Sequence, residues 1–370
     1  MIKDRFPVRV DMHDARLSYE GRVDMDWYEG PCFVYPASNV KIRFKGTGLA
    51  VAIANHRACY STFIGTMTDG VQDRICVYDV NTADTSFSYH YEKDRGEEWD
   101  NGRLFTVCEG LPDAEHEVMI FKRMDCAQTY AVTGIFLSAG AKLLDCSPQY
   151  DMKLEFYGDS VTAGEVTEAV EYAGKSDPAH NGEYSNAYCG YAWQTARLLN
   201  AEIHDIAQGG IALLDDTGWF AGPDFKGIFN MYDRMEYHPD LGVTKRWDFT
   251  RYMPDTVIIA IGQNDANPVD YMKEDYNGEK AVFWRAAYKY FIGLIRKRRP
   301  DADIVLTTTI LMHDASWDRA IDEVCRDIRQ TDKKVYHFLY KRNGAGTPGH
   351  IRTPEAAEMA EELAAFIREL

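Results

Sequence analysis

Four segments in the C-terminal half of the sequence carry groups that together could perform acyl transfer. Ser160 lies in "YGDSVTAG", Gly209 and Gly210 in "AQGG", Asn264 in "GQND" and His350 in "TPGH". A serine hydroxyl becomes a good nucleophile when a histidine takes its proton, and the resulting oxyanion needs preorganised hydrogen-bond donors. The candidate donors are the backbone N–H of Ser160, a glycine N–H and the side-chain amide of Asn264.

Each motif taken alone is also typical of a turn or loop. From residue 151 on, however, the motifs follow strand-like apolar runs that alternate with helical patterns. We expect strands at 154–157, 202–207, 256–261, 303–310 and 334–340, and helices at 190–200, 281–299 and 353–370. This alternation predicts a three-layer α/β/α domain with a parallel sheet over residues 151–370. Ligands of such sheets bind beyond the carboxyl ends of the strands, so the placement favours one shared site.

The N-terminal part has a different rhythm. Runs at 32–54, 116–124 and 130–140 are short, alternating and rich in aromatic and β-branched residues, with Gly-, Asp- and Pro-containing turns between them. This pattern predicts an all-β sandwich of the jelly-roll type over residues 1–148. We interpret it as an accessory domain beside a catalytic domain.

The motifs resemble the conserved blocks of the SGNH, or GDSL, hydrolases, which centre on Ser, Gly, Asn and His. Ser160 and Asn264 match their blocks closely, His350 fits the last block, and either Gly209 or Gly210 fits the glycine block. The N-terminal segments "RLSYEGRVDMDWYEG" and "HEVMIFKRMDCAQTYAVTGIFLSAG" are similar to the β-sandwich of carbohydrate esterase family 2. The resemblance implies a serine esterase that needs no cofactor. Its substrates would be O-acetylated oligosaccharides from plant polysaccharides of the xylan or mannan type, often acetylated at the sugar 6-position.

One departure from the family pattern concerns the group that orients the histidine. SGNH enzymes usually carry an aspartate three residues before it, where this sequence has Thr347. Some members of carbohydrate esterase family 2 use a Ser–His dyad with a backbone carbonyl instead, and the Gly349 carbonyl is the candidate here. Asp314 is a second candidate, and its alternative role is the N-cap of a following helix.

Other polar and aromatic residues near the motifs have supporting roles. Asp159 and Asp265 are expected to accept backbone N–H bonds that hold the Ser160 and Asn264 loops. Trp219 and Trp317 are candidate platforms for a sugar ring, and burial in the core is the alternative for each.

Charge and cysteine usage exclude several classes of function. The net charge of −17 leaves no basic footprint for nucleic acid. The eight cysteines show no metal-ligand spacing, and the sequence shows no signal peptide and no apolar run long enough to cross a bilayer. We therefore expect a cytoplasmic protein without a metal or a membrane partner, and the sequence leaves its oligomeric state open.

The predicted function is thus deacetylation of oligosaccharides. Two alternatives remain. One is an SGNH lipase, thioesterase or acyltransferase that acts on longer acyl chains. The other is a non-catalytic carbohydrate-binding protein, which the missing aspartate at position 347 favours and the retained Ser160 and His350 disfavour.

Overall fold

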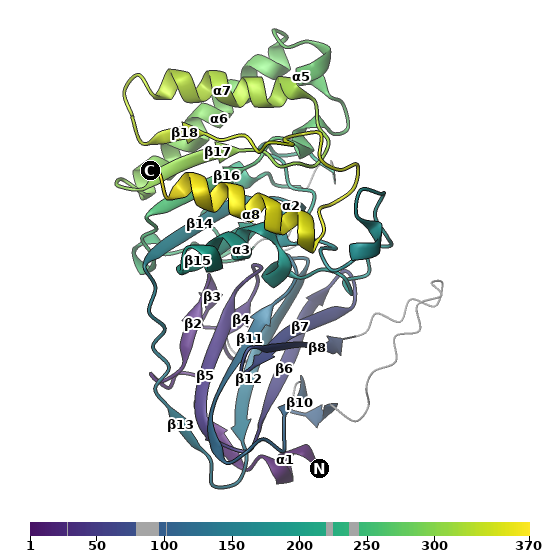
Figure 1. Cartoon of the computed structure of the whole chain (residues 1–370), viewed down its shortest axis with the longest axis vertical. Helices are drawn as coiled ribbons and strands as arrows, with labels where there is room; N and C mark the ends of the chain where they lie inside the picture. The colour runs from purple at the N-terminus through teal and green to yellow at the C-terminus, as the bar shows by residue number, and fades with distance from the viewer. Residues whose placement is uncertain (28, 79–95, 101, 220–224, 237–243) are drawn as a thin grey trace. The chain divides into compact units, whose positions relative to one another are not determined.

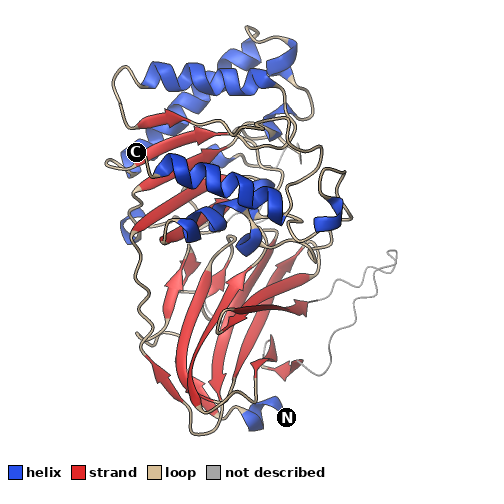
Figure 2. Cartoon of the chain, in the orientation of Figure 1, coloured by secondary structure: helices blue, strands red, loops and turns tan. Residues whose placement is uncertain are grey.

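The chain forms two compact units, which are described separately. The computed structural model describes residues 1–27, 29–78, 96–100, 102–219, 225–236 and 244–370. Unit 1 comprises Met1–Gln149 and His180–Glu183, and unit 2 comprises Tyr150–Ala179 and Tyr184–Leu370. Figure 2 shows strands with little helix in unit 1 and helices beside strands in unit 2.

Unit 1 is a sandwich of two antiparallel sheets. One sheet has the order β3-β4-β12-β6-β10-β9, with β1 also paired to β12, and the other has the order β13-β5-β11-β7-β8, with β2 paired to β5. The strands are β1 (Val8–Val10), β2 (Ser18–Glu20), β3 (Val23–Asp24), β4 (Cys32–Phe33), β5 (Asn39–Gly46), β6 (Leu49–Ala58), β7 (Thr62–Thr68), β8 (Val71–Tyr78), β9 (Gly96–Trp99), β10 (Gly102–Cys108), β11 (Ala114–Lys122), β12 (Gln128–Leu137) and β13 (Lys142–Leu144). A short helix, α1 (Ile2–Arg5), precedes them. The predicted all-β sandwich is confirmed.

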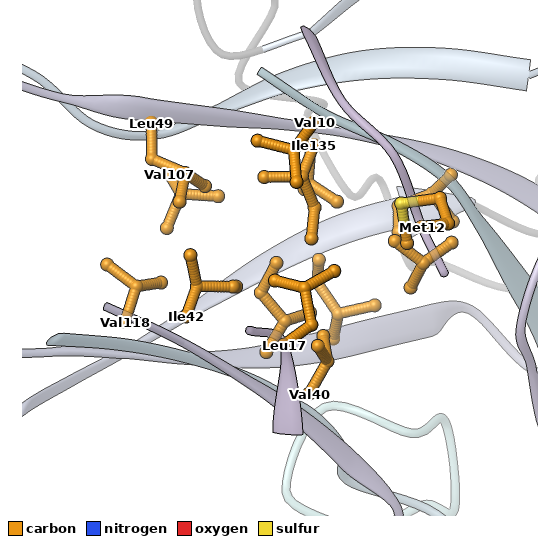
Figure 3. Packing of buried hydrophobic residues seen from close by; sticks show 14 of the residues in the cluster. Val10, Met12, Leu17, Val40, Ile42, Leu49, Val107, Val118 and Ile135 are labelled. Carbon is orange, nitrogen blue, oxygen red and sulfur yellow. The ribbon is translucent and has the colours of Figure 1, made fainter. Parts of the chain in front are cut away.

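The core of unit 1 follows from the period-2 alternation of its strands. In β5, Val40 and Ile42 are fully buried because successive side chains of a strand point to opposite faces. Figure 3 shows them, with Val118 of β11, facing Leu49 and Ile135 of the other sheet. Burial of each such side chain contributes about 1.5–3 kcal/mol to folding.

Unit 2 contains a parallel sheet of order β15-β14-β16-β17-β18. Its strands are β14 (Met152–Gly158), β15 (Ala201–Ala207), β16 (Thr256–Ala260), β17 (Asp303–Thr307) and β18 (Val335–His337). Counted along the sequence, β14 is the first strand of this sheet, and it lies between the second, β15, and the third, β16. The order of the strands reverses at β14 and β16, and this switch point is where α/β sheets bind their ligands.

Helices and short helical turns connect these strands, and α8 follows the last strand. The α-helices of unit 2 are α2 (Ser160–Ala163), α3 (Tyr191–Leu198), α4 (Ile228–Met231), α5 (Tyr271–Glu274), α6 (Glu279–Arg298), α7 (Ala315–Ile328) and α8 (Thr353–Ile367). In the described part of unit 2, the 3₁₀ turns are η1 (Val170–Tyr172), η2 (Ala187–Cys189), η4 (Phe249–Arg251) and η5 (Asn264–Ala266). Within the described ranges, no helix combines the length and apolarity that a bilayer-spanning segment requires.

The helices cover both faces of the parallel sheet. Phe156 and Tyr157 are neighbours in β14 and so point to opposite faces. Phe156 packs edge-on against Tyr191 of α3, and Tyr157 packs edge-on against Phe291 of α6. The helix α8 packs on α3, and α7 packs on α6 (Figure 1). The predicted three-layer α/β/α architecture is confirmed.

A buried ion pair joins β14 of this sheet to the end of α6. The guanidinium of Arg299 donates from Nε and Nη2 to the two carboxylate oxygens of Glu155 at 2.8 and 2.7 Å, and both side chains are 0% exposed. The remaining nitrogen, Nη1, donates to the carbonyl oxygen of Phe249 at 3.0 Å. The pair therefore fixes the helix against the strand that carries the nucleophile candidate.

Breaking this pair lowers the stability of unit 2. Glu155→Gln is expected to reduce the free energy of unfolding by about 3–5 kcal/mol, because it leaves the buried Arg299 charge uncompensated. Urea-induced unfolding monitored by circular dichroism measures the change. As a control, Asp327→Ala removes the half-exposed partner of Lys289 and should cost no more than about 0.5 kcal/mol. Equal effects of the two variants would contradict the assigned role of the buried pair.

Candidate active site

Ser160 lies at the carboxyl end of β14, at the switch point of the sheet, and is the first residue of α2. The strand ends in Gly158, where an added Cβ would lie 2.1 Å from the hydroxyl oxygen of Thr162, so the turn requires glycine. Asp159 caps α2, since its Oδ1 accepts the N–H of Val161 at 3.0 Å. The local sequence thus presents the serine where the crevice of the sheet is expected.

His350 lies next to Ser160 although 190 residues separate them. Its Nε2 is 2.7 Å from the serine Oγ. The loop that ends at His350 is held by the loop after β17, where the N–H of Met312 donates to the carbonyl oxygen of Thr347 at 2.9 Å. This pairing brings the base to the nucleophile.

The other ring nitrogen of His350 contacts Asp177, a residue that the sequence patterns do not single out. Nδ1 lies 2.6 Å from Oδ2 of Asp177, and the backbone N–H of His350 donates to Oδ1 at 2.9 Å. Because a carboxylate only accepts, Nδ1 carries the proton and Nε2 is left to accept from the Ser160 hydroxyl. The three side chains therefore have the geometry of a nucleophile, a base and an orienting acid.

The prediction that the Gly349 carbonyl orients His350 is wrong, because Asp177 occupies the Nδ1 position. Gly349 is needed instead because a side chain at this position would clash with the loop that carries Asp177. A Cβ there would lie 2.8 Å from Oδ1 of Asp177 and 2.5 Å from the carbonyl oxygen of Lys175. Glycine at this position thus lets the loop that carries the acid approach the histidine.

The prediction that Asp314 orients the histidine is also wrong, and its alternative role is confirmed. Asp314 is the N-cap of α7, and its Oδ1 accepts the N–H of Ser316 at 3.0 Å. Thr347, three residues before the histidine, is buried and forms an isolated bridge with Leu311. Neither residue contributes a group to the imidazole, and the expected dyad is in fact a three-residue arrangement.

Asp177 comes from the long connection between α2 and α3. Near the ends of this connection the N–H of Asn186 donates to the carbonyl oxygen of Gly164 at 2.9 Å, so the segment leaves and returns at one place. One signal for it exists in the sequence, since residues 173–182, "AGKSDPAHNG", have neither a strand nor a helix pattern. Long irregular loops in compact domains are commonly functional. The signal identifies the loop but not the residue within it.

Asp159 also joins the Ser160 turn to the Asn264 loop. Its Oδ2 accepts Nε2 of Gln263 at 2.8 Å and Nδ2 of Asn264 at 3.1 Å. Gln263 in turn accepts the hydroxyl of Thr309 at 2.7 Å. Burial raises the pKa of Asp159 to about 6, while the hydrogen bonds that it accepts oppose the rise. The prediction that Asp159 holds its loop is confirmed.

Asp265 ties the Asn264 loop to the glycine loop after β15. Both of its carboxylate oxygens lie 3.1 Å from the N–H of Leu213, and Oδ1 accepts the indole N–H of Trp284 at 2.8 Å. Complete burial raises the pKa of this carboxyl group to about 7. Asp265 is therefore a loop-holding residue, as expected from the sequence.

Of the two glycines that could donate a backbone N–H to an oxyanion, Gly210 is the better candidate. Its φ of +72° is favoured by glycine, and its carbonyl oxygen accepts the N–H of Trp219 at 3.1 Å. The carbonyl oxygen of Gly209 accepts the side-chain amide of Gln208 at 3.0 Å. Among the described residues, the N–H groups of Gly210 and Ser160 have no acceptor. Both are therefore available to a ligand.

The two tryptophans differ in their surroundings. Trp317 is 0% exposed, donates from its indole to Asp270 at 3.0 Å and packs edge-on against Trp284. The prediction that it forms a sugar platform is wrong, because its rings belong to the core between α6 and α7. Trp219 is 69% exposed, and its backbone bond to Gly210 anchors it beside the glycine loop.

A second carboxylate faces the imidazole from the serine side. Oε2 of Glu165 lies 3.9 Å from Nε2 of His350, and the N–H of Glu165 donates to the carbonyl oxygen of Ser160 at 3.0 Å. Sequence patterns give this residue no role. An anionic neighbour at this distance favours the protonated imidazole that forms when the serine loses its proton.

Comparisons with known proteins match both units. Residues 19–146 match the family model described as carbohydrate esterase 2 N-terminal. The cellulase/esterase CelE of Acetivibrio thermocellus is 28% identical over 97% of this chain, and the acetylxylan esterase / glucomannan deacetylase of Cellvibrio japonicus is 26% identical over 69%. The chain spans 40% of the length of the first relative and 67% of the second.

A solved structure extends the match to the fold. A family two carbohydrate esterase from Clostridium thermocellum, solved in complex with cellohexaose, aligns with a TM-score of 0.75 at 26% identity. The alignment covers 95% of this chain and 98% of that one. The similarity therefore includes the β-sandwich and the α/β/α unit together.

Proposed function

Because the chain resembles carbohydrate esterase family 2 along nearly its whole length, we propose that it is a serine esterase that removes O-acetyl groups from oligosaccharides. The substrates are acetylated fragments of plant polysaccharides of the xylan or mannan type. The relatives support this class, since one is an acetylxylan esterase / glucomannan deacetylase. The cellohexaose in the similar structure supports a carbohydrate ligand.

The observation that carries the proposal is the continuous contact from Ser160 through His350 to Asp177. The two distances, 2.7 and 2.6 Å, are those of hydrogen bonds between a nucleophile, a base and an acid. Such an arrangement serves acyl transfer on several unrelated folds. The chemistry needs no cofactor, because the chain itself supplies every group.

In the first half-reaction, Oγ of Ser160 attacks the acetyl carbonyl carbon and its proton passes to Nε2 of His350. The tetrahedral oxyanion takes hydrogen bonds from the N–H groups of Ser160 and Gly210 and from the Asn264 side-chain amide, which uses the hydrogen of Nδ2 that is not bonded to Asp159. When the intermediate collapses, the bond from carbon to the sugar oxygen breaks. The protonated histidine then gives its proton to that oxygen, and the acetyl group stays on the serine.

In the second half-reaction, a water molecule attacks the acetyl-serine carbonyl while His350 takes one of its protons. The bond from carbon to Oγ breaks, the serine recovers a proton from the histidine, and acetate leaves. Asp177 keeps its negative charge throughout and holds the imidazole in the tautomer that both halves require. Glu165 adds a second negative charge near the imidazolium.

Trp219 is the candidate for sugar recognition. Its side chain is exposed and its backbone N–H donates to the carbonyl oxygen of Gly210, and a flat apolar ring of this kind can stack on a pyranose. The backbone bond to Gly210, a proposed oxyanion donor, supports a sugar contact close to the ester that is cleaved.

The substrate profile tests this function against its alternatives. Wild-type protein is expected to hydrolyse 4-nitrophenyl acetate, and to hydrolyse the butyrate at least about tenfold more slowly, because each methylene that a pocket does not accommodate costs about 10–200-fold. It is also expected to release acetate from acetylated xylo- or manno-oligosaccharides. Fast turnover of octanoyl esters would instead indicate a lipase or thioesterase. Oligosaccharide binding without acetate release would indicate a non-catalytic binding protein.

A further inference from the structure

We propose that Arg352 is a positioning residue of the same site, which keeps Asp177 ionised and aimed at His350. This inference rests on the proposed function. It adds a fourth residue to the contacts that join Ser160, His350 and Asp177. Arg352 itself contacts neither the serine nor the substrate. Three observations carry it: the contacts of the carboxylate, the anchoring of the arginine, and the state of its remaining nitrogens.

The first observation is that Asp177 is shared between the histidine and the arginine. Nη2 of Arg352 donates to Oδ1 at 2.8 Å, the same oxygen that accepts the backbone N–H of His350. The other oxygen, Oδ2, contacts Nδ1 of the imidazole. The arginine therefore fixes the rotation of the carboxylate, and its positive charge favours the ionised form that accepts the Nδ1 proton.

The second observation is that Arg352 is rigidly placed. It is the N-cap residue of α8, and its N–H donates to Oε2 of Glu355 at 2.9 Å. The next residue, Thr353, donates from its N–H to the carbonyl oxygen of Thr167 at 2.8 Å. Arg352 lies only two residues after His350. One short anchored segment therefore positions both side chains against the carboxylate of Asp177.

The third observation is that packing alone does not account for an arginine here. The side chain is 0% exposed, and its Nε and Nη1 have no hydrogen-bond partner among the described residues. A buried guanidinium in this state is costly, because each unpaired nitrogen has lost its hydrogen bonds to water. The contact with Asp177 is the feature that an apolar residue would lose.

The consequence is a division of roles within the site. His350 becomes positively charged when it takes the serine proton, and Asp177 stabilises that charge only while it is ionised and in contact. Arg352 provides both conditions before substrate arrives. Losing a charged hydrogen bond of this kind is expected to reduce kcat about 10- to 100-fold.

The test compares Arg352→Met and Arg352→Lys with the wild type in the full chain. For 4-nitrophenyl acetate, Arg352→Met is expected to lower kcat about 10- to 100-fold with KM within about twofold. The urea unfolding midpoint should fall less than in Arg299→Met, because Asp177 is 19% exposed and keeps its contact with His350. Arg352→Lys restores the charge without the planar fork, so it should recover part of kcat. If the methionine variant does not fold, the lysine variant alone carries the test, because its kcat must then lie below that of the wild type.

Arg299→Met is the matched control. Arg299 is equally buried, but it pairs with Glu155 away from the site, so its loss should lower the unfolding midpoint and leave kcat per folded molecule unchanged. Full kcat in folded Arg352→Met would overturn the proposal. A loss of activity that merely follows the folded fraction, as in an unstable variant, would overturn it as well.

A spectroscopic readout separates this inference from the proposed function. The Nδ1 proton shared by His350 and a carboxylate gives a far-downfield proton signal in the nuclear magnetic resonance spectrum of the resting protein. We expect that signal to shift or disappear in Arg352→Met and to be retained in Arg299→Met. An unchanged signal in Arg352→Met would contradict the coupling, and this holds whether or not the wild type hydrolyses esters.

Discussion

Asp177→Asn is expected to lower kcat for acetyl ester hydrolysis about 10,000-fold in a protein that remains folded. The amide at this position can donate a hydrogen bond to Nδ1 of His350, which then becomes the acceptor. The imidazole proton moves to Nε2, and the nitrogen that must take the Ser160 proton is blocked. Steady-state kinetics with 4-nitrophenyl acetate, alongside a circular dichroism spectrum, measures the effect.

Asp314→Asn is the matched control for this prediction. Asparagine caps helices about as well as aspartate, so α7 should keep its start and kcat should remain within about twofold of the wild type. If instead Asp314→Asn abolished turnover and Asp177→Asn preserved it, the acid of this site would have to come from the loop after β17. The two variants therefore decide between two loops of the same domain.

Ser160→Ala is expected to remove turnover almost completely, with a loss of about a million-fold in kcat. The substitution deletes the atom that forms the acyl bond, whereas the oxyanion donors and any sugar contacts remain. Stability should change little, because among the described residues the Oγ has one hydrogen-bond partner, His350. Acetate release from acetylated oligosaccharides measures the loss, and sugar binding measured by calorimetry should persist.

Ser147→Ala is the control variant for that measurement. Its hydroxyl donates to Asp145 on the surface of unit 1 and should not affect acetate release. Retained turnover in Ser160→Ala would mean that another nucleophile acts, and the assignment of the serine would be wrong.

The architecture was predictable from the sequence because its main signals are periodic. Burial alternates along most of β5 because one face of that strand is covered. The whole of β16 is apolar or buried because both of its faces are covered. The same logic extends to the position of Ser160 and Asn264, since both follow neighbouring strands of a parallel sheet. Residues that end strands are placed by the sheet itself, so their proximity needs no knowledge of the loops.

The acid of the site lies outside that logic. Asp177 is held by contacts with His350 and Arg352 that depend on how two long loops fold, and loop conformation leaves no periodic trace in the sequence. The absence of an aspartate at position 347 showed that something else must orient the histidine, but it could not show what. Trp317 illustrates the same limit, because a tryptophan in a core and one on a surface look alike in a sequence.

The location of the acid also has an evolutionary consequence. Because Asp177 and His350 belong to different loops, each loop can change while the other keeps its part of the site. An acid at position 347 would be difficult to accommodate: Thr347 is 1% exposed, and its hydroxyl has no hydrogen-bond partner among the described residues. An aspartate there would bury a charge without compensation. The chain can therefore accept changes in the loop that carries Asp177 more easily than a transfer of the acid to position 347.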